Sequence, residues 1–327
     1  MIKHSYGTAI RSAFEYLLEN YPECFIIGQG LWSPWYVGNT MTDLDKKYGE
    51  HRIIDTPVSE AAVTGLAVGA SLCGSKPVVV HPRIDFMLYA MDPVVNQAAK
   101  WAHMTGGSSN PGLTVRCIIN RGGEQGAQHS QSLHSWFAHI PGLRVVMPYS
   151  VEDARDLLIA SVLCKDPVIF IDDSWLYKEE DELKPINEMK LSSIEPKVIS
   201  EGTDITIVGS SYSTKLAVDA ANLLKSDHGI SSDVVDLRVL SPLNNKNIIN
   251  SVLKTKNLIV IDGGTKTAGF AAEVITAVVE SIPENTLNSK PLRLTLPDCP
   301  APTSRVLENA YYPKVSDIVN KIIVNLG

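Results

Sequence analysis

The sequence predicts an α/β protein of two domains, each built around a parallel sheet that helices cover. Short apolar strands alternate with amphipathic helices along most of the chain, a pattern typical of buried parallel sheets. A chain of 327 residues is longer than a domain with a single hydrophobic core usually is. A polar, acidic stretch near 178–200 has no period and separates two such series. We therefore expect domains at 1–185 and 198–327, joined by a linker at 186–197.

The first series begins with a helix at 7–20, whose apolar residues recur every three or four positions. A strand at 24–27 follows and ends at Gly28. The same alternation predicts helix 59–72, strand 77–80, helix 86–104, strand 114–119, helix 151–163 and strand 168–171. Strands this apolar indicate a sheet that is buried on both faces.

The second series repeats the arrangement on a smaller scale. It predicts strand 205–209, helix 214–224, strand 234–237, helix 245–253, strand 258–262, helix 268–281 and a closing helix 315–324. This series forms the second α/β domain.

Composition and charge exclude several classes of function. The net charge of −7 lacks the basic excess that binding to a phosphate backbone needs, so we expect no nucleic-acid partner. No segment offers 18 uninterrupted apolar residues, and the first twenty carry charges throughout without a signal-peptide core, so we expect a cytoplasmic protein without a membrane partner. The five cysteines are odd in number and widely spaced, which favours structural burial over disulfides or zinc.

Three patterns that could bind phosphates or metals are incomplete. Gly28-Gln29-Gly30 lacks a third glycine, and 263–269 lacks the Walker arrangement, so both are interpreted as strand-to-helix turns. His129, His134 and His139 recur every five residues and do not share a helical face. We expect no metal site in this chain.

Glu60 begins an otherwise apolar, small-residue helix in the segment DTPVSEAAVTGLAVGA. Two interpretations compete. Glu60 could be a first-turn acid that stabilises the helix dipole after Ser59 as N-cap, or a functional acid in a dry pocket. Spacing alone favours the first.

The same segment resembles the stretch around the catalytic glutamate in the β subunits of pyruvate and branched-chain 2-oxo acid dehydrogenases. The resemblance continues before it in KKYGEHRIIDTP and after it in GAQHSQSLHSWFAHIPGLRVVMPYSVEDARDLL. It extends in order through EGTDITIVG, VVDLRVLSPL, and LPDCPAP followed by LENAYYP. Because this agreement extends over nearly the whole chain, the interpretation of Glu60 as a functional acid is favoured over that of a structural first-turn acid.

The resemblance implies a transketolase-like pyrimidine-binding domain followed by a transketolase C-terminal domain, in an α2β2 assembly that uses thiamine diphosphate and Mg²⁺. The β chain holds the pyrimidine half of the cofactor, and the α chain holds the diphosphate and magnesium half. Gly-Asp-Gly marks the α half and is absent here, so a separate α subunit is expected. The implied reaction decarboxylates a 2-oxo acid and transfers the acyl group to the lipoyl group of a dihydrolipoyl acyltransferase, which would dock on the C-terminal domain.

The resemblance also assigns individual residues. Glu60 shares a proton with N1′ of the aminopyrimidine, which favours the tautomer whose N4′ can remove the thiazolium C2 proton. Phe86 falls where an aromatic ring stacks on the pyrimidine, although a core phenylalanine explains it equally well without the family. His129 falls where an active-site histidine meets the substrate or the lipoyl group; the alternative is a solvated loop histidine.

The sequence departs from the family near the expected pocket. Gln29 stands where an acid is common, and Asp262-Gly263-Gly264 replaces Asp-Glu-Gly. His81 and Arg83 replace a phenylalanine and a small residue, so we expect them to contact a polar or anionic part of a substrate unlike pyruvate. An outward salt bridge of Arg83 with Asp85 or another acid is the alternative.

Two alternative functions stay open. A split transketolase-like carboligase would pass the activated unit to an aldehyde or sugar, and the polar His81 and Arg83 lean slightly that way. A non-catalytic stabilising subunit is disfavoured because Glu60, Phe86 and His129 are all present.

Overall fold

The computed structural model describes residues 3–327 and divides them into two units. The first unit comprises residues 3–120 and 136–194, and the second comprises 121–135 and 195–327. The segment 121–135, expected in the first domain, is thus grouped with the second unit. The boundaries at 185 and 198 stay a prediction.

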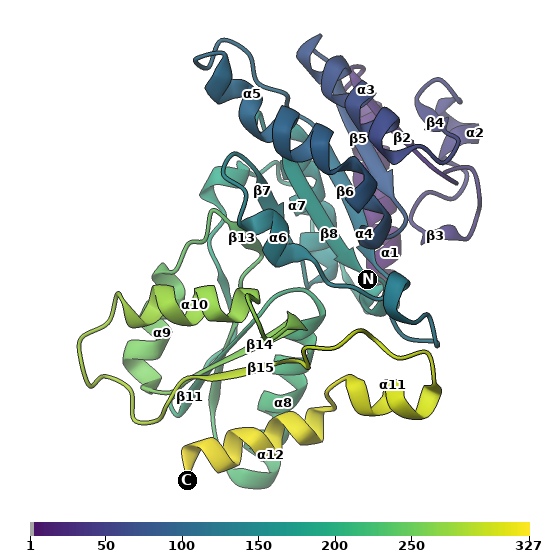
Figure 1. The fold of residues 1–327 in the computed structure, drawn as a ribbon. Coiled ribbons are helices and arrows are strands. Elements are labelled where there is room, and N and C mark those ends of the chain that lie inside the picture. Colours follow the sequence, from purple (N-terminus) through teal and green to yellow (C-terminus); the bar gives the residue numbers. More distant parts are fainter. Residues whose placement is uncertain (1–2) are drawn as a thin grey trace. The chain divides into compact units, whose positions relative to one another are not determined.

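Six strands of the first unit form a parallel sheet in the order β7, β8, β6, β5, β2, β4 (Figure 1). They are β2 (Cys24–Gly28), β4 (Ile53–Asp55), β5 (Lys76–His81), β6 (Thr114–Ile119), β7 (Arg144–Val146) and β8 (Val168–Asp173). Every residue of β6 and β8 is buried, because helices cover both faces of the sheet. The α/β class with a parallel sheet is confirmed.

Helices flank this sheet in two layers. In Figure 1, α1 (Tyr6–Asn20) and α7 (Val151–Leu163) pack together on one face, and α3 (Glu60–Leu72) and α5 (Ala99–Met104) lie on the other. Ser5 caps α1 by accepting from the Thr8 amide, and Ser150 caps α7 by accepting from the Asp153 amide.

The single helix predicted at 86–104 is wrong. The segment is broken into α4 (Ile84–Met87), the 3-10 turn η1 (Leu88–Ala90), the π-helix η2 (Asp92–Ala98) and α5. Pro93 lies in the first turn of η2 and has no amide to donate, so the regular α pattern cannot run through it.

Short elements escaped prediction. In the first unit these include β1 (Lys3–Ser5), which pairs with β9 (Glu180–Glu182), together with β3 (Tyr36–Asn39) and α2 (Leu44–Tyr48). Elements of three to five residues are too short for a period to show.

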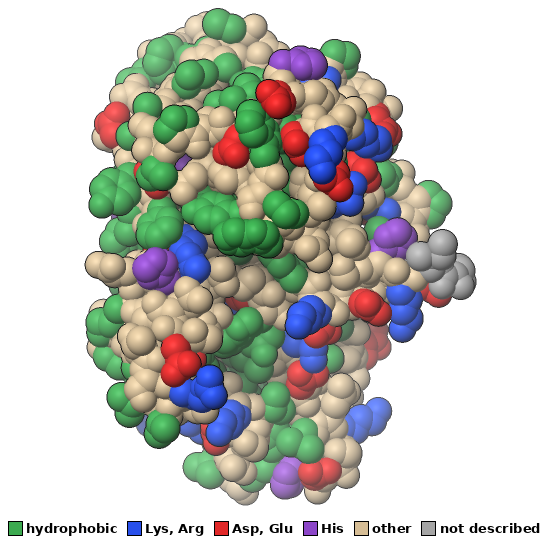
Figure 2. Space-filling view, turned by 90° about the vertical axis from the view of Figure 1, so that its right-hand side faces the viewer, with side chains coloured by type: hydrophobic (Ala, Val, Ile, Leu, Met, Phe, Trp, Pro, Cys, Tyr) green, Lys and Arg blue, Asp and Glu red, His purple; other side chains and the backbone are tan. Residues whose placement is uncertain are grey.

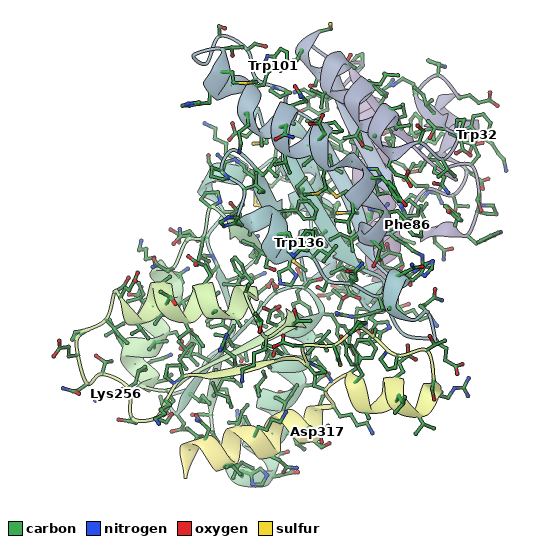
Figure 3. All side chains as sticks on the ribbon, viewed as in Figure 1. Trp32, Phe86, Trp101, Trp136, Lys256 and Asp317 are labelled. Atoms are coloured by element: carbon green, nitrogen blue, oxygen red, sulfur yellow. The ribbon has the colours of Figure 1, made fainter. Side chains whose placement is uncertain are left out.

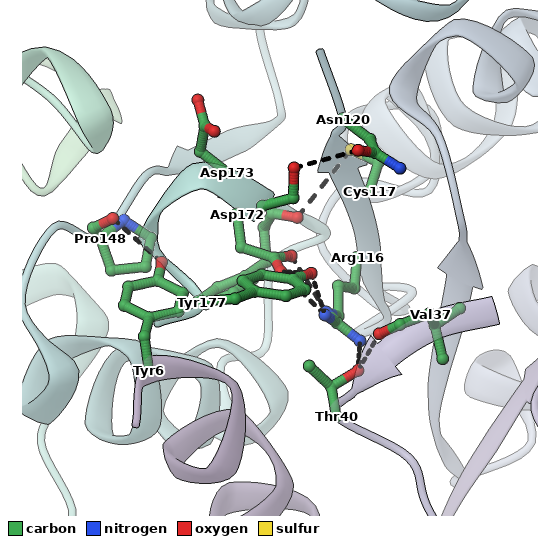
Figure 4. Close-up of polar contacts among 12 residues, drawn as sticks. Tyr6, Val37, Thr40, Arg116, Cys117, Asn120, Pro148, Asp172, Asp173 and Tyr177 are labelled. Atoms are coloured by element: carbon green, nitrogen blue, oxygen red, sulfur yellow. Dashed lines mark hydrogen bonds and ion pairs between the residues drawn. The ribbon is translucent and has the colours of Figure 1, made fainter. Parts of the chain in front are cut away.

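A buried ion pair ties the middle of the first sheet to its surroundings (Figure 4). Arg116 is completely buried, and its Nε and Nη2 donate to the two carboxylate oxygens of Asp172 at 3.0 and 2.8 Å. Its Nη1 donates to Thr40 Oγ1, and the Tyr177 hydroxyl donates to Asp172. Each charge therefore has several partners, which offsets the cost of removing it from water.

The second unit contains a five-stranded sheet in the order β10, β12, β11, β14, β15, in which only β10 is antiparallel to its neighbour. The strands are β10 (Lys197–Ser200), β11 (Ile205–Gly209), β12 (Ser232–Asp236), β14 (Leu258–Thr265) and β15 (Leu292–Leu296). Strand β10 overlaps the end of the stretch expected to lack regular structure.

Alternate residues of β11 face opposite layers of this unit. Ile205 and Ile207 belong to the apolar cluster that also takes in residues of α8 (Tyr212–His228) and α12 (Val315–Leu326). The intervening Thr206 hydrogen-bonds Ser251 and Thr255 of α9 (Lys246–Thr255). Helix α10 (Phe270–Val279) packs on β14.

No helix within residues 3–327 combines the length and the apolar character that crossing a membrane requires.

Candidate functional site

A pocket lies at the carboxyl edge of the first sheet. Gly28 is in register with Asp55 of β4 and Val80 of β5, so the residues that follow these parallel strands meet at one edge. Gly28 has no room for a side chain, because a Cβ there would lie 2.3 Å from the Val80 carbonyl oxygen. The pocket is partly open to solvent and is lined by Gly28, Gln29, Thr56, Pro57, Ser59, Glu60, Val63, Val80 and His81.

Glu60 brings a carboxylate to this pocket from the first residue of α3. Its side chain is half-buried. Among residues 3–327, the structure gives it no side-chain hydrogen bond or ion pair. Ser59 occupies the N-cap position, but its side chain makes no capping bond. Ser59 is therefore the N-cap by position, as expected, without a capping bond from its side chain. The carboxylate of Glu60 is available to a ligand.

His81 lines the same pocket from the last position of β5. Its side chain is buried, and a hydrogen bond of 3.2 Å joins its Nε2 to Thr64 Oγ1, one turn after Glu60 on α3. Burial lowers the pKa of His81 to about 4. The imidazole is therefore neutral near pH 7.

The loop after β2 carries Trp32 and Tyr36 and contributes Gln29 to the lining of the pocket. Gln29 Nε2 donates to the Tyr36 hydroxyl at 2.7 Å. Asp55 Oδ1 accepts from the Gly30 amide at 2.6 Å, and Trp32 Nε1 donates to the Ile53 carbonyl. Asp55 thus fixes the start of the loop that follows Gln29.

Phe86 and Arg83 belong to the first unit but do not line this pocket. Phe86, labelled in Figure 3, is half-buried on α4. Arg83 Nη1 donates to the Asn120 carbonyl at 3.0 Å, at the end of β6. The proposed roles of both residues stay predictions.

His129 lies in the second unit, at the end of the 3-10 turn η3 (Ala127–His129). The segment that carries it is anchored within that unit at three points. Arg121 donates to the Gly263 carbonyl, the Glu124 amide donates to Glu308, and His134 pairs with Asp262 at 2.9 Å. Burial, the largest influence, would raise the pKa of Asp262, but His134 and backbone amides outweigh it and lower that pKa.

Comparison with known proteins decides the family. Residues 3–178 match the family described as transketolase, pyrimidine binding domain, and residues 195–318 match transketolase, C-terminal domain. The mitochondrial pyruvate dehydrogenase E1 component subunit beta of Saccharomyces cerevisiae is 36% identical over 96% of this chain and 86% of its own. The corresponding subunit of Rickettsia bellii is 36% identical over 96% of both chains.

This chain belongs to the family of pyruvate dehydrogenase E1 component β subunits. It also shares its fold with a solved split-gene transketolase, described as an inactive beta4 tetramer, at a TM-score of 0.79, 19% identity and 98% coverage of both chains. The predicted transketolase-like fold of two domains is confirmed.

For an E1 β subunit, the structure brings Glu60 and His81 together and adds residues that the sequence analysis did not single out. Thr64 and Asp55 are the main additions, because one orients His81 and the other fixes the loop of Gln29. The spacing of Thr64, four residues after Glu60, was the available signal, since such residues share a helical face.

Proposed function

We propose that this E1 β subunit supplies the pyrimidine half of a thiamine-diphosphate site and acts in the decarboxylation of a 2-oxo acid. The observation that carries the proposal is Glu60, a carboxylate without a partner among the described residues, in a pocket at the carboxyl edge of a parallel sheet. Ligands bind at this edge in open α/β folds.

The pocket suits an aminopyrimidine. Its lining combines apolar side chains, Pro57, Val63 and Val80, with the polar groups of Glu60 and His81, which together would hold a heteroaromatic ring. When bound, thiamine diphosphate supplies a thiazolium that adds to the 2-oxo carbon and accepts the electron pair released with CO₂. In this proposal, Glu60 holds and exchanges the proton at N1′ of the ring.

An α partner would complete the site. Helix α3 leaves Leu66 62% exposed and also exposes Ala61, Ala62, Gly65 and Gly69. A Cβ at Gly69 would meet nothing within 4 Å, so this chain's own packing does not require that glycine. Figure 2 shows apolar side chains exposed on the face that it presents. A small, apolar helix face beside Glu60 supports close approach by a second chain, which would hold the diphosphate and Mg²⁺ in an α2β2 assembly.

The acceptor in this proposal is the lipoyl group of a dihydrolipoyl acyltransferase, and His129 is the residue that would meet it. The anchored segment 121–135 supports this role, because a catalytic histidine needs a fixed position. Arg83 is the proposed contact for an anionic part of the substrate, and Phe86 the proposed stacking ring.

Calorimetry tests the shared site. Thiamine diphosphate and Mg²⁺ are titrated into this chain alone and into the chain co-expressed with an α-type subunit, and the complex is then assayed with a panel of 2-oxo acids. We expect tight binding and CO₂ release only with the partner. Tight binding to this chain alone would contradict the proposal that it holds only half of the site. Release of CO₂ with acyl transfer to aldehydes, but not to lipoyl protein, would show that the complex is a carboligase and not a dehydrogenase.

A further inference from the structure

The pocket contains a second titratable side chain besides Glu60, that of His81. His81 is 3% exposed, lines the pocket and is bonded through Nε2 to Thr64. Among residues 3–327, the structure gives the imidazole of His81 no hydrogen bond besides this one. One nitrogen of a buried imidazole is therefore left without a protein partner.

This nitrogen, Nδ1, is not one of the fully enclosed polar atoms without a partner among the described residues, so it keeps access to the solvent in the pocket. The same polar surface beside Glu60 becomes favourable when a heteroaromatic ring with donors and acceptors on its edge enters the pocket.

We propose that His81 is a binding residue for the aminopyrimidine ring of the cofactor, to which its free ring nitrogen hydrogen-bonds. This inference rests on the proposed function of Glu60 and adds a second contact from the same chain. Thr64 is the positioning residue that fixes the orientation of the imidazole. Because Thr64 and Glu60 lie one turn apart on α3, movement of that helix would displace both polar contacts together.

Three variants of the reconstituted complex separate this role from simple packing. His81→Leu removes both ring nitrogens, whereas His81→Asn keeps a polar group near the position of Nδ1. Thr64→Val removes the positioning hydroxyl at nearly constant volume. Ser161→Ala is the matched control, because Ser161 is also a buried hydroxyl of the first unit but bonds Leu157 on α7, outside the pocket.

The measured quantity is the Kd of thiamine diphosphate with Mg²⁺, together with the Kd of an analogue in which a benzene ring replaces the aminopyrimidine. We expect His81→Leu to weaken the cofactor about tenfold, the effect of one lost hydrogen bond. His81→Asn should recover most of that loss, Thr64→Val should cost about threefold, and Ser161→Ala should change nothing. With the benzene analogue, the difference between wild type and His81→Leu should vanish.

The outcomes separate the two proposals. If Glu60→Gln weakens the cofactor while His81→Leu and His81→Asn bind it like wild type, the role of His81 is wrong and that of Glu60 stands. An equal loss for cofactor and benzene analogue would also overturn the ring contact, since it would show a packing defect. A wild-type complex that binds no thiamine diphosphate would overturn both.

Discussion

The first unit contains two sets of polar side chains whose surroundings differ. Arg116 and Asp172 are completely buried, and Thr40 and Tyr177 provide further hydrogen bonds to them (Figure 4). At the pocket, by contrast, Glu60 has no side-chain partner among residues 3–327, and His81 has a single one.

Arg116 and Asp172 stabilise the fold through their contacts with each other and with their neighbours. Glu60 and His81 are available for contacts with a ligand. A buried charge is tolerated when neighbours satisfy it, and its role is then complete within the chain. Polar groups that line a pocket and lack such neighbours are open to solvent and can bind a ligand, which in our proposal is the cofactor. The predictions below follow from this contrast.

The largest expected effect on stability comes from breaking the satisfied set. Asp172→Asn leaves Arg116 with an uncompensated buried charge, so the free energy of unfolding should fall by about 3–5 kcal/mol. Urea denaturation followed by circular dichroism measures this change. Glu60→Gln is the control and should stay within about 0.5 kcal/mol of wild type. Equal losses of unfolding free energy in the two variants would contradict the distinction between the buried ion pair and the pocket residues.

The free energy of unfolding, measured as a function of pH, tests the environment of His81 in the pocket. The pKa of His81 is about 4 in the fold and 6.5 in its ordinary state, so the unfolded chain binds the proton more readily. Stability from neutral His81 is complete above pH 6.5 and is lost as the pH falls towards 4. The total change is up to about 3 kcal/mol.

His81→Asn should remove this part of the pH dependence. Urea midpoints at intervals between pH 7 and pH 4 compare the variant with wild type. Parallel curves for the two proteins would show that His81 is not a buried neutral group.

The smallest effect concerns the loop beside the pocket. Tyr36→Phe removes the hydroxyl that accepts from Gln29, which should lower the free energy of unfolding by about 0.5–1.5 kcal/mol. The Kd for the cofactor should rise less than about threefold, because Gln29 itself stays in the pocket lining. A rise above tenfold in calorimetry would place Gln29 among the essential contacts.

The sequence predicted the parts of the fold that depend on local pattern. Strand Thr114–Ile119 and helix Val151–Leu163 have the predicted bounds, because the strand is a short, mainly apolar run and the helix begins after a serine cap. The broken helix around Pro93 was missed, since its apolar period continues across the π-turn.

Predicting the site was harder, because its contacts depend on tertiary structure. The bond between Thr64 and His81 joins a helix to a strand seventeen residues away, which no periodicity reveals. Similarly, only the parallel register of β2 and β4 places Asp55 against Gly30. The role of Glu60 was predicted through resemblance and stays a prediction, whereas its helical spacing alone favoured a structural acid.

The most direct test of the central claim is turnover of 2-oxo acids by the α-containing complex with wild-type Glu60 and with Glu60→Gln. The carboxamide keeps the size of the side chain but cannot hold or exchange the proton at N1′. We predict a loss of kcat of about 10²–10⁴-fold with unchanged assembly and thermal stability. Turnover equal to wild type in a correctly assembled complex would contradict the assignment of Glu60 as the residue that activates the cofactor.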